Sequence, residues 1–134
     1  SNSALLGDAP LRHSLSRLDL RIMKLDCGLP RTFKKFNRPG KGVDLEKITS
    51  GLAGLSRLAP TAIQTLVAEG PHGNLSPDNI SAWIIRLKRI KPASIQLYTL
   101  DREGPDRKIW KASPEELLLL KNRLEDEGLT AQIY

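Results

Sequence analysis

Polar and charged side chains that could bind a ligand lie inside segments whose other residues are typical of buried strands. In residues 20–26 (LRIMKLD), alternation places Lys24 and Asp26 on the same side. In residues 94–101 (SIQLYTLD) it places Gln96 and Tyr98 together, and Gln64 has the corresponding place in residues 62–69. A carboxylate accepts hydrogen bonds from hydroxyl groups, and an ammonium group pairs with anions. These residue types suit the recognition of a polar small molecule.

A charge inside a sheet needs a physical reason, because burying it costs several kcal/mol unless it is paired or serves a ligand. A polar wall built from several neighbouring strands predicts a wet concavity in which a ligand binds. The alternative is a sheet whose polar side simply faces water, as in an open two-layer fold. The pattern favours the concavity, with the site at the carboxyl ends of the strands, where α/β barrels have it.

Four segments rich in isoleucine, leucine, valine and threonine are the predicted strands: residues 20–26, 62–69, 94–101 and 130–134. Helices are predicted to follow four capping residues, each preceding leucine or isoleucine at helical spacing: Asp8, Asp44, Ser76 and Ser113. Residues 27–42 form the one long loop. Strand–helix alternation requires a parallel sheet with right-handed crossovers, so the predicted fold class is α/β, in a single domain over residues 1–134.

Composition narrows the possible functions. The 134 residues include one cysteine, Cys27, which excludes an intramolecular disulfide and cannot alone hold a structural zinc ion or an iron–sulfur cluster. No apolar run approaches the roughly 20 residues that cross a bilayer, so no membrane association is expected, and the single cysteine fits a reducing cytoplasm.

The net charge of +6 permits an anionic partner. Its basic residues, however, are spread through residues 31–41, 86–91 and 107–111, and only 4% of the residues are aromatic. A solvated basic surface is therefore favoured over nucleic-acid binding.

Three stretches resemble, in order and spacing, the carboxyl-terminal half of radical S-adenosylmethionine (radical SAM) enzymes of the iron–sulfur oxidoreductase type. They are KLDCGLPRTFKKFNRP, IQTLVAEGPHGNLSPDNISAWIIRLKRIKPASIQLYTLDREGP and SPEELLLLKNRLEDEGL. The opening SNSALLGD also resembles the turn that follows the third barrel strand in that family. The resemblance implies a partial, TIM-like (β/α)6 barrel, of which this chain would hold strands four to six.

The same resemblance implies a parent enzyme that cleaves S-adenosylmethionine reductively at a [4Fe-4S] cluster, acting on a substrate that the sequence does not reveal. In that family a CxxxCxxC loop holds the cluster, and a glycine-rich segment receives the cofactor's amino group; this sequence contains neither. The chain is therefore expected to hold no catalytic or metal-binding residue, to be inactive alone, and to pair with a missing amino-terminal half of its barrel.

The resemblance assigns places in the cofactor or substrate wall to six residues: Lys24, Asp26, Gln64, Gln96, Tyr98 and Arg102. The planar guanidinium of Arg102 suits carboxylate recognition. Ordinary ion pairs are the competing interpretation, between Lys24 and Asp26 or between Arg102 and either Asp101 or Asp26.

Several other residues are predicted to be structural. His72 is interpreted as a turn residue, Trp83 and Trp110 as packing residues, and Cys27 as a buried or idle thiol, while Asn74 could equally be a site residue or a loop or turn residue. Ser1, Asn2 and Ser3 indicate either an expression remnant or a cut from a longer chain.

An unpaired edge at residues 20–26 predicts a homodimer, unless the final TAQIY segment covers an edge. Two further functions stay open at this point: a basic module that binds nucleic acid or an anionic ligand, and a non-catalytic interaction domain.

Overall fold

A computed structural model describes residues 3–4, 6–17 and 21–134, and it contains a parallel sheet of four strands. The strands are β1 (Ile22–Lys24), β2 (Ala62–Leu66), β4 (Ser94–Tyr98) and β6 (Ala131–Ile133), and they lie side by side in the order β1-β2-β4-β6. The predicted α/β class and the four strand locations are confirmed. Leu20, which the first predicted strand included, lies outside the described residues.

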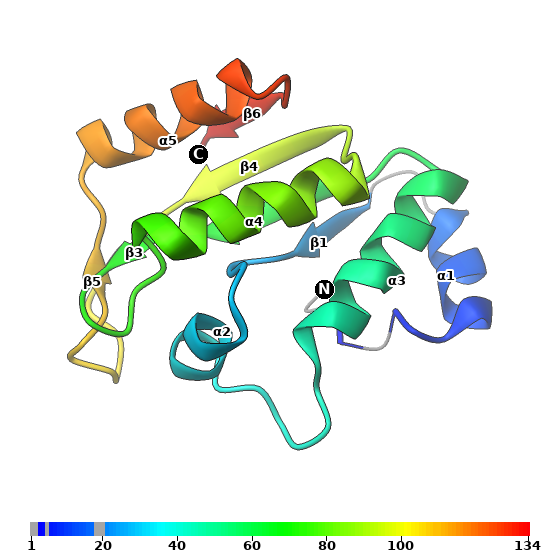
Figure 1. Cartoon of the computed structure of the whole chain (residues 1–134), viewed down its shortest axis with the longest axis horizontal. Helices are drawn as coiled ribbons and strands as arrows, with labels where there is room; N and C mark the ends of the chain where they lie inside the picture. Colours follow the sequence, from blue (N-terminus) through cyan, green and yellow to red (C-terminus); the bar gives the residue numbers. More distant parts are fainter. Residues whose placement is uncertain (1–2, 5, 18–20) are drawn as a thin grey trace.

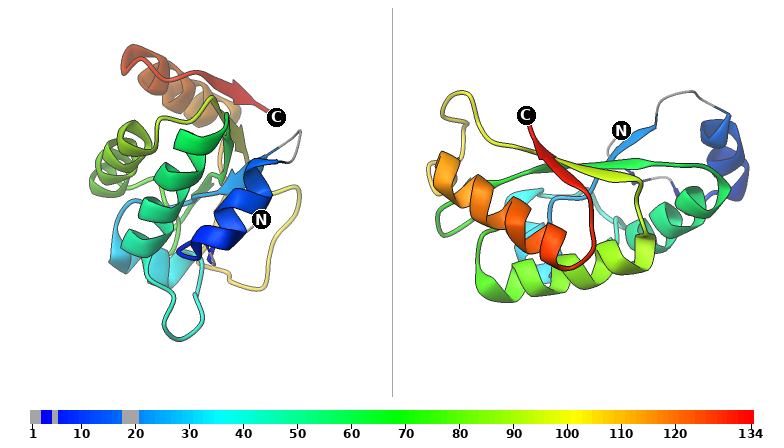
Figure 2. Two further views of the ribbon diagram at one scale, coloured as in Figure 1. Left: turned by 90° about the vertical axis from the view of Figure 1, so that its right-hand side faces the viewer. Right: turned by 90° about the horizontal axis from the view of Figure 1, so that it is seen from above.

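Three helices connect these strands and cover one face of the sheet (Figures 1 and 2). They are α3 (Leu45–Leu58), α4 (Pro77–Ile90) and α5 (Pro114–Asp126). Asp44, Ser76 and Ser113 each accept backbone hydrogen bonds at the start of their helix, and Ser113 forms a full capping box with Glu116. The predicted starts of these helices are therefore correct.

The amino-terminal helix α1 (Ala9–Ser16) packs beside α3 (Figure 1). The Arg12 guanidinium donates a hydrogen bond to the Leu6 carbonyl and lies against Gly54 of α3, where the lack of a side chain leaves room for it. Asp8 precedes α1 as predicted but its side chain makes no capping hydrogen bond. The sequence pattern that predicts this helix also includes Leu18, which is outside the described part of the chain.

The core lies between the sheet and the three covering helices. Met23, Ile63 and Ile95, which occupy one register row across β1, β2 and β4, are 3%, 0% and 0% exposed. Residues that alternate with them point to the opposite face and stay partly exposed. In Figure 2, none of the described helices covers that opposite face, which we call the open face.

The predicted strand at residues 62–69 is wrong in its second half. The Val67 amide still donates to the Tyr98 carbonyl, but Ala68 donates to the Asn74 side chain instead of continuing the ladder. The chain then forms a short strand β3 (Ala68–Glu69), which pairs antiparallel with β5 (Trp110–Lys111). The side-chain amide of Asn74 thus ends β2 and redirects the backbone.

The predicted loop at residues 27–42 is also wrong, because it contains the helix α2 (Pro30–Phe36). Pro30 is at the first helical position, where its missing N–H costs nothing. The helix lies at the carboxyl end of β1 (Figure 1). Its seven residues lack a side-chain cap, so the proline is not accompanied by a capping residue that would have marked the helix start in the sequence.

Strands β1 and β6 form the two edges of the sheet. The first strand lies at an edge of the sheet, where the Ser3 hydroxyl donates to the Lys24 carbonyl, and the final segment pairs with β4 on the far side. Association through this edge stays a prediction, which light scattering over a dilution series would test. In the described part of the chain, no helix has the length and apolarity needed to cross a membrane.

Candidate functional site

The candidate site lies on the open face, near the carboxyl ends of β1, β2 and β4. Lys24, Gln64 and Gln96 are register partners on these strands, and Gln132 of β6 continues the row. Neighbouring strands are about 4.8 Å apart, so the row presents one ammonium group and three carboxamides side by side. The open face therefore carries a band of hydrogen-bonding groups across the whole sheet.

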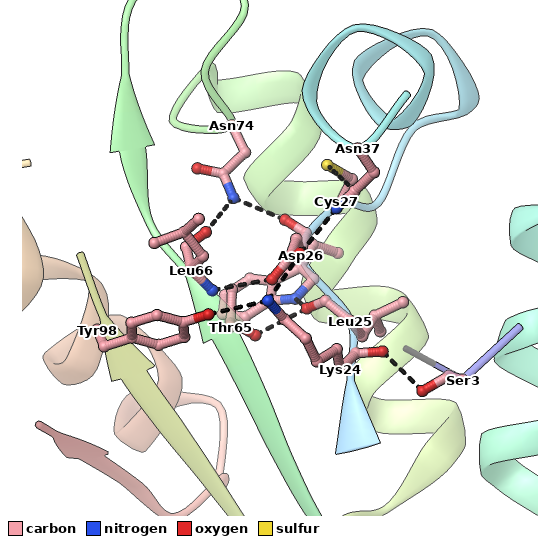
Figure 3. Close-up of polar contacts among 11 residues, drawn as sticks. Ser3, Lys24, Leu25, Asp26, Cys27, Asn37, Thr65, Leu66, Asn74 and Tyr98 are labelled. Carbon is pink, nitrogen blue, oxygen red and sulfur yellow. Dashed lines mark hydrogen bonds and ion pairs between the residues drawn. The ribbon is translucent and has the colours of Figure 1, made fainter. Parts of the chain in front are cut away.

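Lys24 is the charged member of this row and is held by Tyr98. Its Nζ atom donates to the Tyr98 hydroxyl at 2.9 Å and lies 5.5 Å from the centre of the tyrosine ring (Figure 3). Burial by itself would lower the pKa of Lys24, but the Asp26 carboxylate and the hydrogen bond to Tyr98 outweigh it and raise that pKa above its usual value. The side chain is still 32% exposed, so a charged ammonium group remains accessible to a ligand.

Asp26 follows β1 and is almost fully enclosed, with 4% of its side chain exposed. Its Oδ1 accepts from the Leu66 amide at 2.8 Å, and its Oδ2 accepts from Asn37 Nδ2 at 2.8 Å (Figure 3). The Lys24 ammonium lies 3.9 Å from Oδ2. Burial raises the pKa of Asp26, against the opposing effect of Lys24. Both oxygens are thus engaged by the protein, and Asp26 serves to hold Lys24 and Asn37.

Two asparagines that hold the site together were not predicted as site residues. Asn74 donates through Nδ2 to the carbonyls of Asp26 and Leu66, at 2.7 and 2.8 Å (Figure 3). Asn79 accepts from the amides of Gly28 and Leu29 and donates to the Asn74 carbonyl. These contacts bind the end of β1 to the start of α4. An asparagine near a turn has many local explanations, so no signal in the sequence is specific to this role.

The other predicted wall residues lie in different environments. Gln64 and Gln96 are partly exposed within the row described above. Arg102 lies beyond the end of β4, because the predicted strand at 94–101 stops at Tyr98 and residues 101 and 102 form an exposed bend. The structure therefore does not bring Arg102 into the row, and its assignment to the wall stays a prediction.

Two cavities meet at this site. One, of about 220 Å³, lies between the end of β1, α2 and the start of α3, and Phe33, Val43 and Ile48 supply its apolar lining. The other, of about 280 Å³, lies between β1, β2 and the segment after β4. Lys24, Asp26 and Asn37 line both. Each volume is slightly below that of a typical pocket for a drug-sized ligand, so either cavity alone suits a part of such a molecule.

The residues present fit the two implied cofactors unequally. Lys24, Tyr98 and the glutamine row offer donors and acceptors that match the carboxylate, hydroxyl and amino groups of S-adenosylmethionine. An iron–sulfur cluster does not fit, because it needs several thiolates and the sequence has one cysteine. Among residues 3–4, 6–17 and 21–134, no three histidine, cysteine or acidic side chains come together in a metal-binding group.

Cys27 itself is fully buried, and its thiol donates to Asn37 Oδ1 at 3.4 Å. Burial raises the pKa of this thiol far above its usual value, which favours the protonated thiol over the thiolate. The interpretation of Cys27 as a buried thiol is confirmed.

Three more residues can be compared with their predicted roles. Trp83 is 2% exposed and packs as predicted, with its indole N–H donating to the Leu25 carbonyl. Trp110 is 46% exposed, so its interpretation as a packing residue is wrong. His72 lies in a turn as predicted, and its Nδ1 is 2.8 Å from Asp106 Oδ2.

Comparison with known proteins gives two relatives in sequence, while no family model matches. GTPase Obg of Brachyspira hyodysenteriae is 30% identical over 125 residues, which is 93% of this chain and 18% of that protein. UPF0026 protein slr1464 of Synechocystis is 31% identical over 107 residues, which is 78% of this chain and 39% of that protein. The chain thus spans less than half the length of either relative. Its sequence has no GxxxxGK[ST] nucleotide-binding loop.

Two solved structures have the same fold. A domain of pyruvate-formate lyase-activating enzyme from Bacteroides vulgatus superimposes with a TM-score of 0.78 at 20% identity, covering 99% of this chain and 78% of that one. A radical SAM methyltransferase from Sphaerobacter thermophilus gives 0.74 at 15% identity, covering 98% of this chain and 38% of that one. The chain therefore has an α/β fold that also occurs in a radical SAM enzyme and in an activating enzyme.

Proposed function

We propose that this chain is the carboxyl-terminal part of a radical SAM enzyme and that its open face forms one wall of the cofactor and substrate site. The observation that carries the proposal is the polar row across the open face, which includes Lys24 at the end of β1, in a fold shared with a radical SAM methyltransferase. Parallel sheets are usually covered on both faces, so a polar face without helices calls for a ligand or for more of the same barrel.

Within this proposal the residues have different tasks. Lys24 and Tyr98 contact an anionic or hydroxyl-bearing part of the cofactor or substrate, and Gln64 and Gln96 contact neighbouring polar atoms. Asp26 positions Lys24, since both of its own oxygens are already hydrogen-bonded. The cluster and S-adenosylmethionine supply the one-electron chemistry, and the cluster ligands come from a part of the parent outside this sequence.

The test uses the complete natural gene product. We expect a CxxxCxxC motif upstream of residue 1, and formation of 5′-deoxyadenosine after anaerobic cluster reconstitution and reduction. Lys24→Ala should lower this activity at least about tenfold, because a lost charge-assisted hydrogen bond is worth about 1.5–3 kcal/mol. Lys47→Ala on the exposed side of α3 is the matched control and should change it less than about twofold.

A reading frame without that motif, or a reconstituted protein that makes no 5′-deoxyadenosine, would overturn the proposal. The 134-residue chain provides an independent check. With its single cysteine it should stay colourless under the same reconstitution.

A further inference from the structure

Two basic segments that are far apart in the sequence meet near the candidate site. Arg38, which follows α2, lies 3.0 Å from Asp106 Oδ2, and the Lys108 carbonyl accepts from the His72 amide. Arg31 and Lys35 of α2 line a cleft together with Gly70, Pro71 and Gly73 of the turn that contains His72. We call the set Arg31, Lys35, Arg38, Arg107 and Lys108 the basic rim. The charge that appears scattered along the sequence is therefore gathered around one turn.

The basic rim differs from the third basic segment, residues 86–91, in how many of its cations form ion pairs. Arg86 and Arg89 on α4 both bind Glu46, and Lys88 on the same helix binds Glu127, so each of these three cations has a carboxylate partner within the fold.

In the rim, by contrast, the described residues place no carboxylate within 4.0 Å of Lys35, Arg107 or Lys108. Asp78 and Asp106 pair with Arg31 and Arg38, and Glu103 lines a neighbouring cleft with Arg107. The rim keeps an excess of positive charge.

Trp110 gives this surface a feature that an ordinary basic patch lacks. Its ring lies against Gly70 of the same turn, and 46% of the residue is exposed. It shares a cleft of about 520 Å³ with Arg107 and Asp106. In this cleft the exposed ring lies beside Arg107, which has no carboxylate partner among the described residues, and beside the acidic residues Glu103 and Asp106. Proteins bind single-stranded nucleic acid where bases stack on an aromatic ring and nearby cations bind phosphates.

We propose that the basic rim and Trp110 bind single-stranded nucleic acid, with phosphates on the rim and one base stacked on Trp110. The second cavity of the candidate site is lined by both Lys24 and Arg38, so a strand on the rim reaches the site's edge. That the nucleic acid is also the substrate rests on the proposed function. The binding itself does not, because it needs neither cluster nor cofactor.

The experiment titrates the 134-residue chain with 12-nucleotide oligo-uridine RNA and oligo-thymidine DNA while recording tryptophan fluorescence. Trp83 is buried and Trp110 is exposed, so quenching reports on Trp110. We expect quenching by either oligonucleotide. With about three phosphate contacts, affinity should fall about eighteenfold when salt rises fourfold.

Three variants and a competitor make the result decisive. Trp110→Leu should weaken binding, followed by anisotropy of a labelled oligonucleotide, about tenfold. A triple variant, Arg31→Gln, Lys35→Gln and Arg107→Gln, should weaken it at least as much. The matched control, Lys47→Gln, Arg57→Gln and Lys88→Gln, carries the same charge change on α3 and α4 and should bind within about twofold of the original chain.

The proposal is overturned by any of three results: no binding at low salt, equal losses in the rim and control variants, or polyglutamate binding as tightly as the oligonucleotides. The last result would mean an acidic protein surface as the partner. Thermal melts of each variant confirm folding. The absence of oligonucleotide binding would not contradict the proposed radical chemistry. Likewise, the absence of 5′-deoxyadenosine would not contradict the proposed binding of nucleic acid.

Discussion

The two faces of the sheet are built from alternate residues of the same strands, yet they serve different ends. On the covered face Met23, Ile63 and Ile95 are buried against helices. On the open face the next residues along, Lys24, Gln64 and Gln96, keep their polar ends partly exposed. Burial of apolar area stabilises the first face, while the second contributes little to stability and is available for binding. Adjacent residues of one strand therefore differ in role: one stabilises the fold by burial, and the next presents a polar group on the open face.

The largest expected effect tests this division directly. Ile63→Ala should lower the free energy of unfolding by about 2–5 kcal/mol, because it leaves a cavity in a fully buried position. The adjacent Gln64→Ala, on the open face, should change it by less than about 0.5 kcal/mol. Urea unfolding of both variants provides the comparison. Equal losses would mean that the open face is also part of the stabilising core.

A second prediction concerns the one buried charge at the border of the two faces. Asp26→Asn should lower stability by about 1–3 kcal/mol, because an amide nitrogen cannot accept the bond that the Leu66 amide or Asn37 now donates. Burial disfavours a charged carboxylate at this position, as the raised pKa of Asp26 indicates, so the neutral amide avoids that cost and offsets part of the loss in stability. Asp101→Asn, at an exposed bend, is the control and should be neutral in the same urea assay. A fully stable Asp26→Asn variant would contradict a positioning role.

A third change sharpens the electrostatics of the open face. Tyr98→Phe removes the hydroxyl that helps raise the pKa of Lys24, so this pKa should fall, as measured by NMR titration of the lysine side chain. A raised lysine pKa stabilises the fold below the unfolded value of 10.5 and ceases to do so as pH rises through the folded value. The variant should therefore lose less stability at alkaline pH. Tyr134→Phe, at the carboxyl terminus, should leave Lys24 unchanged.

The smallest effect on stability is expected at Asp106, in the segment after β4. The hydrogen bond to His72 lowers the pKa of Asp106 to about 2. A depressed carboxyl pKa stabilises the fold above the unfolded value of 3.8, and this contribution disappears as pH falls toward 2. Asp106→Asn should thus melt slightly below the original chain at pH 6, with the difference vanishing near pH 2. A difference in melting temperature that persists at pH 2 would mean that the Asp106 side chain stabilises the fold through packing and not through its charge.

The fold was predictable where local chemistry decides it. Capping residues predict the starts of three helices, at Asp44, Ser76 and Ser113. The alternation of apolar and polar residues around Ile63 and Ile95 predicts a sheet with one apolar face. The site was predictable only in part. Asn74 binds Asp26 across 48 positions in the sequence, and the same asparagine ends β2. Contacts of that range have no periodicity and no local signature, so neither the split strand nor the asparagine bridge is visible in a single sequence.

The hydrogen bonds made by Asn79 should also affect how fast backbone amide protons exchange with solvent. The amides of Gly28 and Leu29 belong to no strand ladder, yet both donate to Asn79 Oδ1 beneath α4. Gly28 is packed so closely on α4 that an added Cβ would lie 1.9 Å from the Trp83 nitrogen. These two protons can exchange with solvent only when α4 lifts from the sheet. We therefore expect hydrogen exchange in this irregular segment to be as slow as in the central strands.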